Sequence, residues 1–468
     1  MFKFFEKLYS VSNMIKGEDI IGEVPDTKHV YQNAIDMAWP SAIESVLIGL
    51  VSVIATMMVS SLGPSAIAAV GITNQPKFIL LAVIFSLNVG VTAIVARRRG
   101  ARDREGANRC LRQALVISVS LAAILSVIGF TFARPMLLFA GAQPDVIDYA
   151  VNYFRFTSIA NFFTSVSLTI NAAQRGSGNT KISMRTNIVA NIINVIVNYL
   201  LINGNFGFPK LGIIGAGMAT LLGSIAAFCM SLRSITRPDG FLYMTLKSNW
   251  KLDKETVKGI AGISSSSFIE QICMRVGFLV TTMLVASLGT IAFATHQICM
   301  NIVNLSFTFG DGLGIGSSAL VGQNLGAKRP DLATIYSKTI QRIALTIGAI
   351  LFVFFIIGRH LLVGLFTDDI SIIKMGGQIL IIVAMMSPLQ TVSVVIGGTL
   401  RGAGDTKFVA YSSLISIGIV RPLTTWLFCY PLGFGILGAW FAFMTDQCLR
   451  LLINSWRFKT GKWTNIRI

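Results

Sequence analysis

Long apolar stretches, separated by short polar, glycine-containing or basic segments, run along almost the whole chain. A transmembrane helix needs about 20 mostly apolar residues, and twelve stretches meet this requirement. They cover about residues 37–61, 66–96, 112–139, 146–173, 182–203, 212–232, 259–288, 290–322, 340–366, 371–400, 408–430 and 436–456. The pattern therefore predicts an all-α membrane protein with twelve transmembrane helices.

Composition supports this class. The chain has 468 residues, of which 53% are hydrophobic and only 13% are charged, whereas soluble domains carry about 25% charged residues. So few charged residues could not cover the surfaces of several soluble domains, which excludes a multidomain soluble protein. The six cysteines are far apart and form no paired motif, so we expect neither a disulfide framework nor a metal site.

The net charge of +18 is distributed unevenly among the loops. Of the 39 lysines and arginines, 31 lie on the side of the two termini: four in the N-terminal tail, five from Arg450 onward, and the rest at the connections that follow even-numbered spans, including the seven arginines of residues 97–112. The opposite loops hold Lys210, Arg359 and Lys374, with Arg134 at a border. Because basic residues stay in the cytoplasm, we expect both termini there. The charge then attracts anionic lipid headgroups and requires no nucleic acid partner.

A constant offset in residue number aligns the two halves of the chain. With this offset Glu44 falls on Glu270, Gly90 on Gly316, and residues 175–181 on 401–407; after a three-residue slip, 212–216 falls on 435–439. Six helices in each half give both halves the same orientation, so the prediction is two parallel six-helix repeats related by an axis along the membrane normal.

The repeat also predicts the domain organisation. Residues 1–30 lack the pattern of a signal peptide, and we expect a cytoplasmic tail there. The expected parts are a tail at 1–32, an N-lobe at 33–236, a cytoplasmic linker at 237–256, a C-lobe at 257–458 and a C-terminal tail at 459–468.

Parallel repeats of this kind are typical of secondary transporters, which bind substrate near the middle of the membrane between the halves. The sequence contains no nucleophile elbow, P-loop or H-E-x-x-H motif. We therefore expect a carrier that is not an enzyme and does not use ATP.

Several motifs carry a family resemblance that extends from about residue 38 to residue 463. They are V-G-Q-N-L-G-A at 321–327, L-R-G-A-G-D-T at 400–406, its first-half copy Q-R-G-S-G-N-T at 174–180, Asn194 and Asn198 in the fifth span, and the basic and aromatic segment 450–463. With these motifs the chain resembles the multidrug and toxic compound extrusion (MATE) family.

The resemblance implies two six-helix lobes that form a V, and export of drugs or organic cations in exchange for protons or sodium ions. It also implies a multi-pass protein of the cytoplasmic membrane, and we expect a monomer with membrane lipid around it and no cofactor. Three carboxylate positions of relatives are neutral here: Ala55, Asn198 and Gln390. The coupling ion is therefore left open between H⁺ and Na⁺.

Four acidic residues lie well inside predicted spans: Glu44, Glu270, Asp311 and Asp446. Charged groups in the membrane are rare and costly, so each is a candidate functional residue. Glu44 and Glu270 are repeat mates, about 10–16 Å from the inner surface at 1.5 Å per residue. Either could carry the coupling ion or bind substrate. The alternative is a structural carboxyl bonded to a helix backbone or to a serine within 264–267.

The other candidates have similar alternatives. Asp311 lies between two glycines and is either an ion ligand or a polar plug at a helix break. Arg421 and Asp446 reach equal depths, about 18–20 Å, and are either a structural ion pair or a gating pair that touches substrate. Gln390, after Pro388, either lines a cavity or joins two helices. The resemblance adds Asn194 and Asn198 as possible ion or substrate ligands.

The sequence therefore favours a secondary active antiporter for drugs or amphipathic organic cations. A lipid-linked sugar flippase of the same architecture is the first alternative, supported by intramembrane Lys77, Arg155, Arg275 and Arg421. A non-coupled channel or receptor-like membrane protein is the second.

Overall fold

The computed structural model describes residues 10–15, 17–144, 146–245, 250–466 and 468. Over these residues it is all-helical, with no strand. The chain forms two compact units, each built of antiparallel neighbouring helices: unit 1 comprises residues 1–42 and 265–468, and unit 2 comprises residues 43–264. The division falls inside α2 (Thr27–Ser60) and α9 (Lys254–Ala286), whereas the lobe boundaries expected from the repeat fall at 236 and 257.

Helix boundaries reproduce the internal repeat. α3 (Pro64–Gly100) and α10 (Thr290–Gly326) begin and end at equivalent positions of the repeat, and the start of α7 (Thr180–Asn203) is equivalent to the start of α13 (Thr406–Ser413). After the three-residue slip, the end of α8 (Ile213–Thr236) is equivalent to the end of α15 (Gly435–Lys459). The expected six-helix repeat is confirmed at the level of individual helix ends.

Eleven helices of the described chain are long and apolar enough to cross a membrane. The twelfth expected span corresponds to α6 (Ile147–Gly176), which is long enough but more polar. Its buried Thr169 bonds to Asn88 and Ser118, and its Ser167 bonds to Ser231. These polar groups are satisfied within unit 2, so α6 spans as an interior helix, and the described chain has the twelve expected transmembrane helices.

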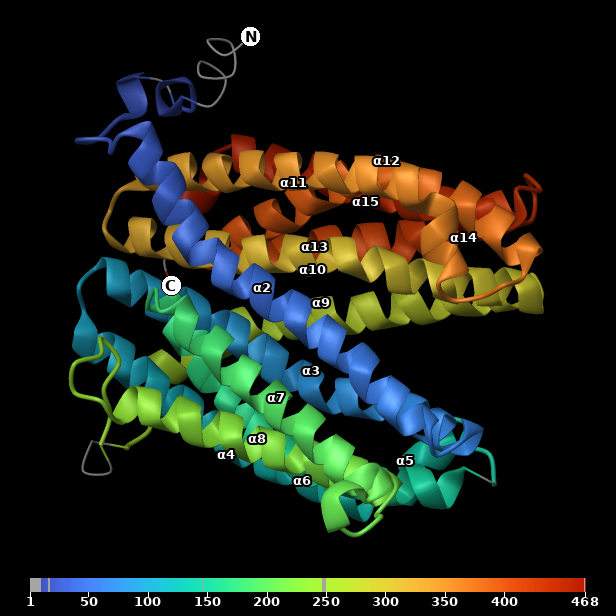
Figure 1. Cartoon of the computed structure of the whole chain (residues 1–468). Coiled ribbons are helices and arrows are strands. Elements are labelled where there is room, and N and C mark those ends of the chain that lie inside the picture. The colour runs from blue at the N-terminus through green and yellow to red at the C-terminus, as the bar shows by residue number, and fades with distance from the viewer. Residues whose placement is uncertain (1–9, 16, 145, 246–249, 467) are drawn as a thin grey trace. The chain divides into compact units, whose positions relative to one another are not determined.

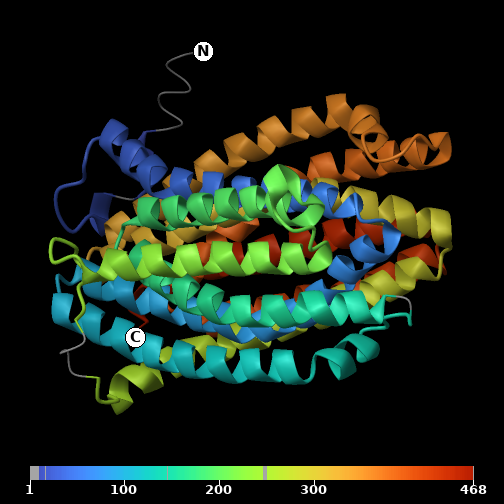
Figure 2. The ribbon, with the colours of Figure 1, turned by 60° about the horizontal axis from the view of Figure 1, so that its bottom comes forward.

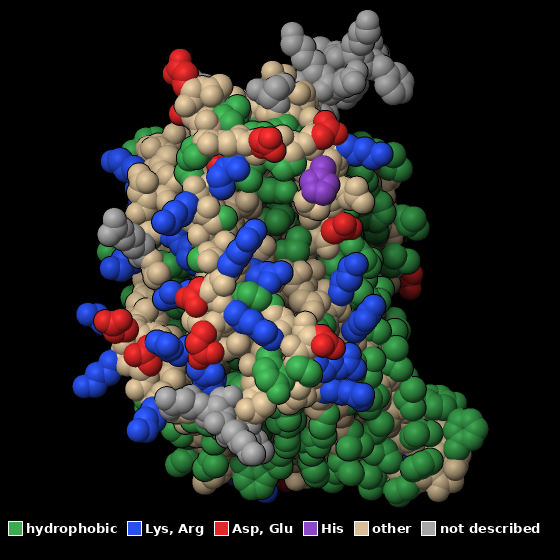
Figure 3. All heavy atoms as spheres, turned by 90° about the vertical axis from the view of Figure 1, so that its left-hand side faces the viewer, with side chains coloured by type: hydrophobic (Ala, Val, Ile, Leu, Met, Phe, Trp, Pro, Cys, Tyr) green, Lys and Arg blue, Asp and Glu red, His purple; other side chains and the backbone are tan. Residues whose placement is uncertain are grey.

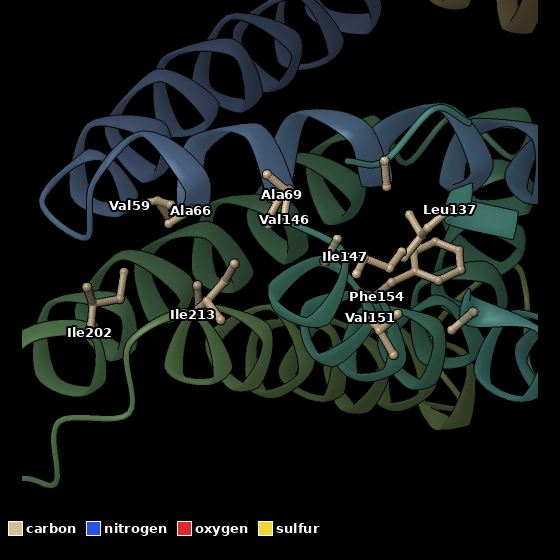
Figure 4. Close-up of a cluster of buried hydrophobic side chains, with 14 of the residues drawn as sticks. Val59, Ala66, Ala69, Leu137, Val146, Ile147, Val151, Phe154, Ile202 and Ile213 are labelled. Carbon is tan, nitrogen blue, oxygen red and sulfur yellow. The ribbon is translucent and has the colours of Figure 1, made fainter. Parts of the chain in front are cut away.

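In unit 2, α6 packs against α3, α4 (Arg104–Thr131) and α8, and α7 packs against α8 (Figures 1 and 2). A cluster of buried apolar side chains joins the end of α2, α3, α6 and the short helix α5 (Ala133–Phe139) (Figure 4). Phe154 and Leu137 are fully buried within it. A 3₁₀ turn, η3 (Asn205–Gly207), links α7 to α8.

In unit 1, α12 (Ile370–Gly402) packs against α10, α11 (Pro330–Gly364) and α15. The eleventh span is not a regular helix: α13 passes into a π-helical segment, η4 (Leu414–Val420), and then into α14 (Arg421–Cys429). Pro422 explains the change, because proline has no N–H to donate to the carbonyl of Gly418. A final 3₁₀ turn, η5 (Lys462–Asn465), follows α15.

The described parts of the tail and linker pack against helices. Residues 10–26 include the turns η1 (Val11–Asn13) and η2 (Gly17–Asp19), and Val11 and Met14 are buried against α11. The helix α2 begins at Thr27, inside the expected tail. In the linker, Leu242 and Met244 are buried, and Gln113 of α4 bonds to the backbone of Lys251 and Asp253.

Basic side chains gather where α3 and α10 end and α4 and α11 begin, and apolar side chains cover much of the adjoining flank (Figure 3). α3 ends with Arg97, Arg98 and Arg99, whose charge suits the negative end of a helix dipole. Asp103 caps the next helix by accepting the Gly106 N–H at 2.8 Å. These local signals fix the ends of the apolar spans.

Candidate functional site

Glu270 on α9 is held by an arginine and a serine from two other helices of unit 1. Arg401 at the end of α12 donates from Nε to Oε2 at 3.3 Å and from Nη2 to Oε1, and Ser413 donates to Oε1 at 3.2 Å. Only 3% of the Glu270 side chain is exposed, against 29% for Arg401. The carboxylate is therefore buried as one half of an ion pair.

Glu44 on α2 has a corresponding environment in unit 2. Ser183 of α7 donates to both carboxylate oxygens at 3.0 and 3.1 Å, and Asn187 donates to Oε1. Arg175 approaches Oε1 at 3.6 Å and donates to the Ser183 hydroxyl at 2.8 Å. Neutral donors therefore hold Glu44 more closely than the arginine does.

The two sites are equivalent under the internal repeat. Arg175 corresponds to Arg401, and Asn187 corresponds to Ser413. From the sequence, both arginines are expected in loops, as headgroup anchors. The only bonding partners suggested for the two glutamates are a helix backbone and a serine within 264–267. The signal was present, since the arginines keep the same spacing as the glutamates. A buried charge is costly unless it is paired, which explains why each carboxylate has an arginine.

Asp311 on α10 is exposed, between the buried Gly310 and Gly312. It interacts electrostatically with Arg401. Arg401 therefore lies within the field of two carboxylates, the bonded Glu270 and the exposed Asp311.

Arg421 and Asp446 form an ion pair inside unit 1. Arg421 donates to Asp446 Oδ2 from Nε at 3.1 Å and also from Nη2. Its guanidinium lies 4.6 Å from the ring centre of Phe278 and 4.1 Å from that of Phe443. The side chains are 2% and 0% exposed. The structure thus joins the two residues that depth suggested as partners, while their part in transport stays a prediction.

Gln390 on α12 is fully buried, and within the described residues neither its amide nitrogen nor its oxygen has a hydrogen-bond partner. Other buried polar atoms without a partner in the described chain occur on α12 itself, on α13, on the π-helical segment and on α15. They belong to Ser393, Ser412, Ser416, Asp446 (Oδ1), Gln447, Arg450 (Nε) and Asn454. Each unsatisfied buried group costs about 1–3 kcal/mol. Because both donors and acceptors are among these atoms, they suit water molecules, which can accept and donate.

Arg450 on α15 connects these features. It donates to Gln447 at 2.7 Å, and it interacts electrostatically with Asp446, Arg421, Glu270 and Arg401. Charged groups thus follow one another from Arg401 at the end of α12 to Arg421 at the start of α14. Sequence reasoning missed Arg450 because it lies near the end of its span and was counted with the C-terminal basic residues.

Asn194 and Asn198 lie together on α7 in unit 2. Asn198 donates to Asn194 at 3.0 Å, and Asn194 donates to Thr220 of α8 at 3.4 Å. Ser183 and Asn187, the donors to Glu44, lie on the same helix at spacings that bring all four to one face. Between the asparagine pair and Glu44, the described residues form no direct hydrogen bond.

A family model matches both halves of the chain. The model is described as MatE, and it covers residues 40–200 and 266–427, two segments that begin at equivalent positions of the repeat. The chain belongs to the MatE family. Members of this family are membrane transporters, which agrees with the expected multi-pass carrier and with the expectation that the chain is not an enzyme.

Relatives match over nearly the whole length. An uncharacterized transporter, YisQ of Bacillus subtilis, is 29% identical over 434 residues, covering 91% of this chain and 94% of the relative. A probable multidrug resistance protein, NorM of Thermotoga maritima, is 25% identical over 447 residues and 94% of both chains. The solved structure of a mutant of the Vibrio cholerae MATE transporter VcmN has a TM-score of 0.85 at 17% identity, over 93% of this MatE chain and 99% of its own.

Proposed function

We propose that this MatE chain is a secondary active exporter of drugs or amphipathic organic cations, driven by the inward movement of protons or sodium ions. Support for the substrate class comes from relatives named as multidrug resistance proteins. We further propose that it works as a monomer in the cytoplasmic membrane, with both termini inside, as the distribution of basic residues predicts.

The coupling step is proposed for unit 1, and the observation that carries it is the Glu270–Arg401 pair. Arg401 interacts with both Glu270 and Asp311, and the partnerless polar atoms of α12 to α15 are in the same unit. A proton or Na⁺ on Glu270 weakens its attraction for Arg401 and lets the guanidinium turn toward Asp311. Ion uptake would then change the contacts among α9, α10 and α12.

Unit 2 is proposed to be secondary in coupling. Two of its familiar carboxylate positions are neutral, Ala55 and Asn198, and Asn198 is bonded to Asn194. Glu44 remains a candidate, but neutral donors and a more distant arginine hold it. Gln390, the third neutral position, lies in unit 1. Its two unpartnered amide atoms can bind a polar group, although the side chain carries no charge.

The test is efflux of a cationic dye from proteoliposomes under separately imposed sodium and pH gradients. We expect one gradient to drive efflux and the other to have little effect, with no efflux in protein-free liposomes. Equal, gradient-independent dye flux would contradict coupling and favour the channel alternative. No dye flux, together with scrambling of a lipid-linked sugar, would favour the flippase.

A further inference from the structure

A cavity of about 720 Å³ opens at one end of unit 2, where α3, α6 and α8 end and α7 begins. Its lining includes four arginines, Arg99, Arg185, Arg233 and Arg237, and a single acidic residue, Asp239. Within the described residues, none of the four arginines forms an ion pair. The cavity therefore concentrates positive charge that no carboxylate of the described chain pairs with.

Comparison with the other half of the chain explains why the cavity exists. In the alignment after the three-residue slip, in which Gly212 falls on Gly435, Gly240 corresponds to Trp463 and Ile235 corresponds to Phe458. In unit 1, Trp463 is 1% exposed and stacks on Phe458 with ring centres 5.3 Å apart. In unit 2, Gly240 has no side chain to fill the corresponding space.

The residues that line the cavity in unit 2 also differ in polarity from their equivalents in unit 1. With the main offset of the repeat, Arg99 corresponds to the buried Leu325, and Gln174 corresponds to the buried Leu400. Three buried apolar residues of one half, Leu325, Leu400 and Trp463, are thus replaced by an arginine, a glutamine and a glycine that line the cavity in the other. The general bias toward basic residues on this side does not account for this, because it acts on both halves alike.

The loop that closes the cavity is held in place by the protein. Arg104 donates to the backbone oxygens of Pro238, Gly240 and Phe241 at 3.1, 2.7 and 3.0 Å. The Arg99 guanidinium lies 4.3 Å from the ring centre of Phe241. The backbone of residues 238–241 is therefore fixed at the edge of the cavity, and the four arginines around it are exposed and accessible to a ligand.

The ligand chemistry follows from the donors. Guanidinium groups bind phosphate oxygens with two parallel hydrogen bonds, and α7 begins at Thr180 with Asn179 making no side-chain cap, which leaves backbone N–H groups available to an anion. Ile182, Met230 and Phe241 add apolar lining. We propose that this cavity binds a phosphate-bearing anion, either the headgroup of an anionic phospholipid or a soluble phosphate compound.

The experiment uses the full-length protein in detergent and measures thermal unfolding with added dioleoylphosphatidylglycerol, dioleoylphosphatidylcholine or inorganic pyrophosphate. Two variants target the cavity: Arg233→Gln with Arg237→Gln removes charge, and Gly240→Trp fills the space as Trp463 does in the other half. The control, Arg102→Gln with Lys181→Gln, removes two charges from exposed neighbouring positions that do not line the cavity.

For the wild type and the control we expect stabilisation by phosphatidylglycerol or by pyrophosphate, and none by the zwitterionic lipid. Both cavity variants should bind the active probe at least about tenfold more weakly. A response to phosphatidylglycerol alone identifies a lipid headgroup, and a response to pyrophosphate alone identifies a soluble phosphate. Equal loss in cavity and control variants, equal effects of both lipids, or no response to any probe would overturn the proposal. If Gly240→Trp does not fold, the charge variant and its control decide.

Discussion

Arg421 donates two hydrogen bonds to a single oxygen of Asp446, and the other oxygen of that carboxylate has no partner in the described chain. The guanidinium also lies over Phe278 and Phe443. The guanidinium of Arg421 thus contacts a carboxylate and two aromatic rings, whereas Oδ1 of Asp446 has no hydrogen-bond partner in the described chain. This asymmetry suggests that Asp446 can accept a further donor while Arg421 remains in place.

The ion pair should stabilise unit 1. Arg421→Ala or Asp446→Ala leaves an unpaired buried charge, which typically costs about 3–5 kcal/mol, so each should lower the melting temperature in detergent and the efflux rate. The exchange Arg421→Asp with Asp446→Arg should recover only part of the stability, because an aspartate beside Phe278 and Phe443 loses the cation–π contacts. Normal melting of both single variants would show that the pair is not important for folding.

Glu270 and Glu44 should differ in their contribution to coupling. Glu270→Gln is expected to abolish gradient-driven efflux in proteoliposomes, because a neutral side chain can no longer exchange Arg401 for an ion. Glu44→Gln should reduce efflux less, since Ser183 and Asn187 can also bond to an amide. Gel filtration and melting curves establish that both variants are folded. Wild-type efflux by folded Glu270→Gln would refute the assignment and direct attention to Asp311.

The orientation of the chain can be tested with single cysteines in a cysteine-free background. Arg102 follows α3 on the side rich in basic residues, and Lys210 lies in an opposite loop. Arg102→Cys should react with a membrane-impermeant maleimide only in permeabilised or inverted membranes, and Lys210→Cys should react in intact cells. The reverse pattern would place both termini outside.

The contribution of Asp253, at the start of α9, to the stability of the folded protein should depend on pH. Hydrogen bonds from the Thr256 side chain and backbone lower the pKa of Asp253. A carboxyl whose pKa falls on folding stabilises the folded state above its unfolded value, about 3.9, and this effect disappears as the pH falls through the folded value. Asp253→Ala should therefore melt earlier than the wild type at pH 7, and the two curves should converge in acid. A difference independent of pH would exclude the charge as the cause.

The sequence alone predicted the membrane class, the helix count and the repeat, because these depend on local properties. Apolar length marks each span, and Gly100 and Gly326 mark equivalent helix ends in the two halves. Equal depth was also enough to suggest Arg421 and Asp446 as partners, since position along a helix follows from residue number. The same reasoning found both intramembrane glutamates, but it did not find what binds them.

Only the tertiary structure decided the partners of these groups. Arg401, in the last turn of α12, bonds to Glu270 of α9, although the two residues are far apart in the sequence. Whether they meet depends on how α9 and α12 are rotated about their axes, and hydropathy does not record this rotation. The cavity beside Gly240 has a similar origin, because it depends on which side chain of a neighbouring loop fills the space. The π-helical segment is different: its cause, Pro422, is visible in the sequence, but how the preceding residues adjust their hydrogen bonds is seen only in the folded chain.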